Sequence, residues 1–102
     1  MVELRSPSDT SEEDLMPTIS RFFGITIQMY WNDHAPPHFH AKKGSTEWVF
    51  GIRDGEVIEA EGRFSKRDIK LIWDWIDARR AELLRNWELA RKDETLNEIA
   101  PL

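Results

Sequence analysis

All three histidines of the chain lie within seven residues, where imidazole side chains could bind a metal ion or transfer protons. They form the pattern His34-x-x-x-His38-x-His40. Residues two apart on a β-strand share a face and lie roughly 6.5–7 Å apart, so His38 and His40 are predicted to point the same way. Neutral imidazole suits zinc and related metals, and histidine also titrates near neutral pH. The spacing is therefore compatible with a metal site or with an acid–base site.

One hypothesis is a site for a zinc-like divalent metal, held by His34, His38 and His40. The loop that contains two consecutive prolines would bring His34 close to the other two. Asp33 or Glu47 would then orient a histidine or complete the coordination shell.

A second hypothesis is metal-free acid–base catalysis, such as RNA cleavage, with His38 and His40 as catalytic residues and Tyr30 assisting. Three basic residues would contact phosphate or an acidic partner: Lys42, Lys43 and Arg53. A third hypothesis is structural, with the histidines bonding to the Pro-Pro loop, filling space beside aromatic rings and contacting a partner protein. Each hypothesis needs the same residues, so the pattern alone does not decide between them.

Four segments alternate apolar and polar residues with the period of a strand: 25–31, 38–42, 47–53 and 57–61. Asp54-Gly55 between the last two predicts a type I′ hairpin turn, in which both residues take positive φ. In the second segment Phe39 and Ala41 would face the core. The opposite face, away from the helix that follows, would then display Tyr30, His38, His40 and Lys42.

Ser65 is the expected N-cap of a helix that continues to about Lys92, with a break near residues 79–83. Its expected core stripe is Ile69, Ile72, Trp73, Ile76, Leu83, Leu84 and Trp87. The sequence thus predicts an α+β fold, in which an antiparallel meander of three or four strands packs against a long C-terminal helix.

A second apolar stripe on this helix contains Leu71, Trp75 and Leu89. Left exposed, such a stripe predicts contact with a partner protein or with a second copy of the chain. The alternative is that the C-terminal tail, with Leu96 and Ile99, folds back over it.

The 102-residue chain has room for one domain, expected over residues 16–102, and it has no cysteine for disulfides or thiolate sites. Residues 1–15 are expected to form a disordered acidic extension. Five acidic residues and one arginine lie in residues 1–16, so the remainder is nearly neutral and a nucleic-acid partner is not favoured. Neither a membrane-length apolar run nor a secretory signal is visible, and a cytoplasmic location is expected.

The most specific motif of the chain is Asp33-His34-x-Pro36-Pro37-His38-Phe39-His40-Ala41. Together with residues 16–24, 29–30, 86–90 and 99–102, this motif resembles the bacterial family known as domain of unknown function 4160. The resemblance covers essentially residues 16–102 and implies no settled activity. It does imply a context, because such proteins are often encoded beside a second small protein in an arrangement like a toxin–antitoxin pair.

The function expected from these features is a protein-interaction module of a toxin–antitoxin-like two-component system. Its partner would be a small cognate protein encoded nearby. The alternative is an enzyme, either a metal-dependent hydrolase or a small ribonuclease that uses His34, His38 and His40.

Overall fold

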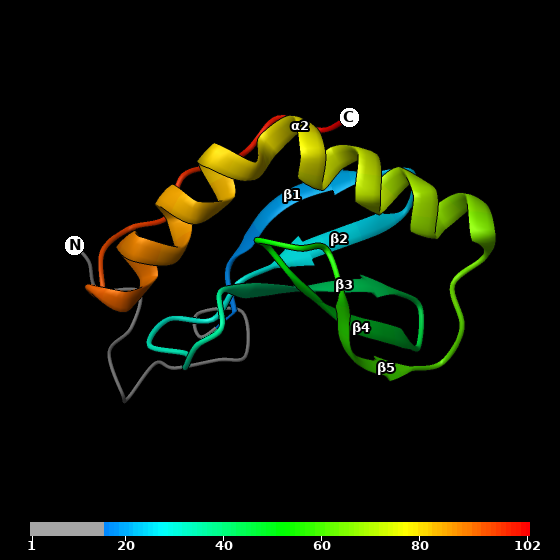
Figure 1. Ribbon diagram of the computed structural model, residues 1–102, viewed down its shortest axis with the longest axis horizontal. Helices are drawn as coiled ribbons and strands as arrows, with labels where there is room; N and C mark the ends of the chain where they lie inside the picture. Colours follow the sequence, from blue (N-terminus) through cyan, green and yellow to red (C-terminus); the bar gives the residue numbers. More distant parts are fainter. Residues whose placement is uncertain (1–15) are drawn as a thin grey trace.

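The computed structural model of the protein describes residues 16–102, so the predicted acidic extension lies outside the described residues. The elements in chain order are β1 (Thr18–Phe22), β2 (Ile25–Gln28), β3 (His38–Lys43), β4 (Thr46–Gly51), β5 (Val57–Glu61) and α2 (Lys66–Arg91). The strands pair antiparallel in the order β1-β2-β3-β4-β5, and α2 crosses one face of the sheet (Figure 1). The predicted α+β fold is confirmed, with five strands rather than three or four.

The additional strand is β1, which period-two alternation does not reveal. Its pairing with β2 shifts between Thr18 and Ser20, so a β-bulge interrupts the ladder there. As a result Ile19 and Ser20 are both buried although they are neighbours in the sequence. A bulge inserts one residue and changes which face the following side chains occupy, which removes the strand signal from this segment.

The turn chemistry also differs from the prediction. Phe23 and Gly24 link β1 to β2 and both have positive φ, at 51° and 81°, as a type I′ turn requires. The type I′ turn predicted at Asp54-Gly55 is wrong, because only Gly55 has positive φ. The Asp54 carboxylate accepts a hydrogen bond from the Glu56 N–H at 3.0 Å, which supports a longer loop between the strands.

Helix α2 begins and breaks where its sequence predicts. The Ser65 hydroxyl accepts a hydrogen bond from the Asp68 N–H at 3.0 Å and so caps the helix. Arg79 has non-helical dihedral angles (φ −122°, ψ 15°), which mark a kink within the predicted break. No helix in residues 16–102 combines the length and the apolar composition that a membrane span requires.

The two tryptophans in the first half of α2 occupy the reverse of their expected positions. Trp75, expected on an exposed partner-binding stripe, is fully buried between Phe22 and Phe39, and its indole N–H donates to the Ala100 carbonyl at 2.9 Å. Trp73, expected in the core, is 47% exposed.

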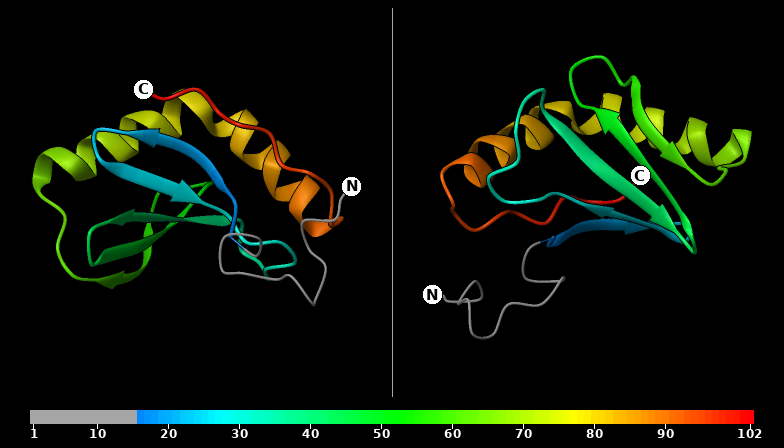
Figure 2. Two further views of the ribbon diagram at one scale, coloured as in Figure 1. Left: turned by 180° about the vertical axis from the view of Figure 1, so that it is seen from behind. Right: turned by 90° about the horizontal axis from the view of Figure 1, so that it is seen from below.

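Helix α2 is rotated so that Trp75 faces Phe22 and Phe39 of the sheet, and this side of the helix is also covered by the C-terminal tail. The tail runs back along α2 (Figure 2), and Ile99 is buried while Leu96 packs against the core. Asn86 is fully buried and fixes the tail through two hydrogen bonds with the Asn97 backbone, at 2.8 and 2.9 Å. The tail therefore covers the side of α2 that contains Trp75. The other two members of the stripe, Leu71 and Leu89, are half-buried.

Candidate metal centre

Strand β3 supplies two imidazoles and the loop before it supplies the carboxylate beside them. Phe39 and Ala41 are fully buried in the core, so the intervening His38 and His40 point to the other side of the strand. His40 is half-buried and its ring packs on Tyr30, with the two ring centroids 4.5 Å apart. This confirms that the two histidines share a face.

The expected solvent exposure of His38 is wrong. Its side chain is buried, and its ring centroid lies 5.1 Å from that of Trp87 in the second half of α2. Beyond the kink at Arg79, the end of α2 lies against the loop that follows β2, where the Asn32 N–H donates to the Ala90 carbonyl at 3.1 Å. The helix end thus reaches the start of β3 and covers His38.

Both ring nitrogens of His38 lie against oxygen atoms. Nδ1 lies 2.7 Å from the Pro36 carbonyl oxygen, which can only accept, so Nδ1 carries the proton of the neutral ring. Nε2 lies 2.8 Å from Oδ2 of Asp33, which also accepts when it is ionised. A proton or a metal ion is needed to make this second contact favourable.

The environment of His40 favours a neutral ring with a bare Nε2. Its Nδ1–H donates to Oε2 of Glu47 at 3.0 Å. Burial lowers the pKa of His40 below its usual value, and this effect exceeds the opposing influence of Glu47. Nε2 is buried and has no hydrogen-bond partner among residues 16–102. The lone pair of a neutral imidazole at such a position suits a metal ion.

Asp33, His38 and His40 converge on one point, because each places a ligand atom within 4.8 Å of the other two. In both histidines Nδ1 is fixed by an oxygen acceptor, which leaves Nε2 as the coordinating nitrogen. This outer-shell arrangement is typical of metal-binding histidines. Two imidazoles and one carboxylate with open positions are the donor set of many catalytic zinc and iron sites.

His34 lies outside this cluster. Its side chain is 93% exposed, and its Nδ1 lies 3.3 Å from Oδ1 of Asp33. Asp33 and Glu47, which were expected to orient a histidine or complete the shell, do contact His38 and His40 respectively. Asp33, rather than the predicted His34, joins His38 and His40 in the cluster.

The cluster opens into a cleft of about 320 Å³ on the outer face of the sheet. Tyr30 lines one side of this cleft, and Val49, Ile58 and Glu59 line the other. An acidic groove of about 510 Å³ shares Val49 and Glu59 with the cleft and continues between β4 and β5.

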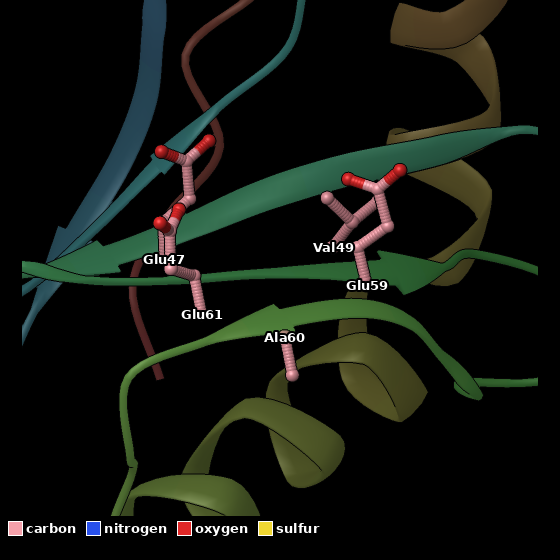
Figure 3. Close-up of a pocket in the computed structure, with 5 residues that line it drawn as sticks. All are labelled: Glu47, Val49, Glu59, Ala60 and Glu61. Atoms are coloured by element: carbon pink, nitrogen blue, oxygen red, sulfur yellow. The ribbon is translucent and has the colours of Figure 1, made fainter.

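Figure 3 shows the carboxylates of Glu47 and Glu61 side by side in this groove, with Glu59 beside Val49. Glu59 was not predicted as a site residue. The cross-strand register that places it opposite Val49, which pairs with His40, is the signal that identifies it.

The three basic residues predicted to contact phosphate are not gathered at the cleft. Lys42 lies 4.0 Å from a carboxylate oxygen of Glu47, and Lys43 binds Asp68 at 3.0 Å near the start of α2. Arg53 is exposed in the loop between β4 and β5. None of the three lines the cleft that contains the histidines.

A protein-family model matches the part of the chain that contains this cluster. A model described as Domain of unknown function (DUF4160) matches residues 24–88, which is more than half of the 102-residue chain. The chain belongs to the DUF4160 family. The segment that matches the DUF4160 model contains Asp33, His38, His40 and Glu47. Comparison with curated proteins and with solved structures finds no match.

Proposed function

We propose that the protein binds a divalent transition metal through Asp33, His38 and His40 and uses it in a hydrolytic reaction. The observation that carries this proposal is the convergence of three ligand atoms within 4.8 Å of one another. One of the three residues, His40, has a buried ring nitrogen without a hydrogen-bond partner among residues 16–102. Leaving such a nitrogen unpaired costs about 1–3 kcal/mol, and coordination of a metal ion removes that cost.

Asp33, His38 and His40 would supply three ligands to a metal ion and line the cleft, so further coordination positions would be open to it, as a catalytic site requires. Such a metal would supply a water-derived nucleophile at neutral pH. Glu47 holds the His40 ring through Nδ1, and Pro36 holds the His38 ring. Tyr30 and Glu59 line the cleft and are the groups available to donate or accept protons beside the substrate.

The charges around the cleft favour a hydrolase whose substrate is not RNA. Glu59 lines the cleft, and Glu47 and Glu61 line the adjoining groove. These carboxylates repel a polyanionic backbone, and Lys42 and Lys43 already lie beside carboxylates of their own. A neutral or cationic substrate suits these surroundings better than RNA.

The test is calorimetric titration of zinc or cobalt into the metal-free protein and into three matched variants. His38→Asn and His40→Asn each remove a ligand, whereas His34→Asn changes an exposed histidine outside the cluster. We expect the wild type and His34→Asn to bind one ion per chain with equal affinity and the other two variants to bind weakly. Absence of stoichiometric binding by the wild type would overturn the proposal.

Hydrolysis is tested on the zinc-loaded wild type with activated ester and phosphodiester substrates. Zinc-loaded His34→Asn is the active control, and His40→Asn is the blank. Turnover that depends on His40 and on zinc supports the hydrolase. Zinc binding without turnover of either substrate class would support the metal centre and contradict the hydrolytic role.

A second candidate, the interaction module of a cytoplasmic toxin–antitoxin-like system, is supported by apolar side chains around the hairpin of β4 and β5. Val57, Ile58 and Trp73 are exposed, and the Trp73 indole N–H donates to the Gly55 carbonyl at 2.8 Å. Exposed apolar residues near one hairpin are candidates for a contact surface. Co-expression with the product of the adjacent gene, followed by size-exclusion chromatography, tests this role. Separate elution of the two proteins would contradict it.

A further inference from the structure

The two edge strands of the sheet, β1 and β5, differ in whether another segment is hydrogen-bonded to them. At the β1 edge the C-terminal tail is attached, because the Ile99 N–H donates to the Ile19 carbonyl at 2.7 Å. Strand β5 pairs only with β4, and within residues 16–102 no other strand pairs with its outer edge. All five of its residues are exposed. An edge strand of this kind presents backbone N–H and C=O groups that another chain can pair with.

The protection of the β5 edge comes from charge rather than from lysine or proline, which the strand lacks. Glu59 and Glu61 are charged, and the pairing with β4 is irregular between Val49 and Phe50. Val57 and Ile58 are 39% and 46% exposed, and they are consecutive. A strand added at this edge would bury part of both side chains.

The charge of this edge determines what can dock there. Glu56, Glu59 and Glu61 are all exposed, and Glu47 lies opposite Glu61 in the cross-strand register. A second copy of β5 would place glutamates against glutamates, and like charges on adjacent strands destabilise their pairing. A segment with lysine or arginine at alternate positions would instead place cations beside these carboxylates.

We infer that β5 is a docking edge for an extended, basic segment of a partner protein, which adds to the sheet as a sixth strand. Backbone hydrogen bonds along β5 provide the binding, and Glu59 and Glu61 select the basic side chains. Because Ile58 and Glu59 also line the cleft, the docked segment lies along the border of the metal centre. The inference does not depend on a bound metal, since the edge and its charges belong to the chain itself.

The probe for this edge is a fluorescein-labelled nonapeptide in which lysine alternates with valine. Binding is followed by fluorescence anisotropy in the presence of a chelator. One control peptide has glutamate in place of lysine. A second keeps the lysines but has proline in place of the central valines, which blocks strand pairing. We expect the lysine–valine peptide to bind and both controls to fail, because the site requires both charge and strand geometry.

Two charge-reversed proteins with the same change in net charge locate the site. Glu59→Lys with Glu61→Lys alters the edge, and Glu82→Lys with Glu88→Lys alters exposed positions in the second half of α2. We expect the first pair to weaken peptide binding by about tenfold or more, as two charge pairs of up to about 1 kcal/mol each would give, and the second pair to change it by less than about threefold.

Hydrogen exchange locates the peptide on the chain, and slower exchange of the β5 amides in the peptide complex is expected. Equal weakening by both charge-reversed pairs, binding of the proline peptide, or protection only outside β5 would each overturn the inference. A dimer of the free protein that Ile58→Lys dissociates would also overturn it, by assigning the edge to a second copy. If the wild type binds the peptide but does not bind zinc, only the metal proposal is contradicted.

Discussion

The two faces of strand β3 meet different demands although their residues alternate along one short segment. On the inner face Phe39 stacks on Phe50, with the ring centroids 5.7 Å apart, and meets the edge of Trp75. On the outer face His38 and His40 contact a backbone carbonyl and the carboxylates of Asp33 and Glu47. One strand therefore contributes to the core and to the candidate site at the same time. Stability should depend on the inner face and metal affinity on the outer face.

Phe39→Ala should cause the largest loss and should test the inner face. A buried phenylalanine reduced to alanine costs about 3–5 kcal/mol, because apolar contacts are lost and a cavity remains. Equilibrium unfolding in urea measures the change. His34→Ala, at an exposed position, should alter the free energy of unfolding by less than about 0.5 kcal/mol. A loss below about 1.5 kcal/mol for Phe39→Ala would contradict the assignment of this face to the core.

Glu47→Ala should have the next largest effect and should act on metal affinity. Removal of the carboxylate that fixes His40 Nδ1 should weaken binding by about 10–100-fold, the range typical of outer-shell partners. Glu61→Ala is the matched control, because Glu61 lies opposite Glu47 on the neighbouring strand, whereas the hydrogen bond to His40 Nδ1 is made by Glu47. Calorimetry compares the two variants. Equal affinity in both would show that Glu47 does not orient the ligand.

The smallest expected effect is the pH dependence of the free energy of unfolding of the metal-free protein. Burial lowers the pKa of His40, so protonation of His40 is harder in the folded chain than in the unfolded chain, where the usual value is 6.5. As the pH falls below about 6.5, the unfolded chain gains this proton first and the free energy of unfolding decreases. The decrease ends once the pH has passed the lowered pKa of the folded state.

Thermal unfolding between pH 7.5 and 5, with chelator present, measures this contribution. His40→Asn has no titrating ring and should show a shallower loss of stability with falling pH than the wild type. Parallel curves for the two proteins would mean that the buried ring of His40 contributes nothing to the pH dependence.

The alternation of residues predicted most of the sheet, because neighbouring side chains of a strand have opposite directions. Phe39, Ala41, Ile25 and Ile27 are buried as their positions predict. The bulge at β1 and the burial of Trp75 could not be predicted in this way. The first breaks the period. The second depends on how α2 packs on the sheet, where Trp75 contacts Phe22 and Phe39, which are distant from it in sequence.

The candidate site was predictable in part for the same reason. His38 and His40 share a face because they are two residues apart on one strand, which is a local property. Whether Asp33 or His34 completes the cluster depends on the loop after β2, which is held by the end of α2 through the hydrogen bond between Asn32 and Ala90. The helix end also covers His38, so a contact with no local sequence signal shapes the site.

X-ray absorption of the zinc-loaded protein would show directly whether Asp33, His38 and His40 form one metal centre. We expect zinc to have two imidazole nitrogens at about 2.0–2.1 Å and carboxylate or water oxygen at about 2.0–2.2 Å. One imidazole contribution should disappear in His40→Asn, and both should persist in His34→Asn. Zinc surrounded by oxygens alone, or two imidazoles that remain in His40→Asn, would show that these residues do not form the metal centre.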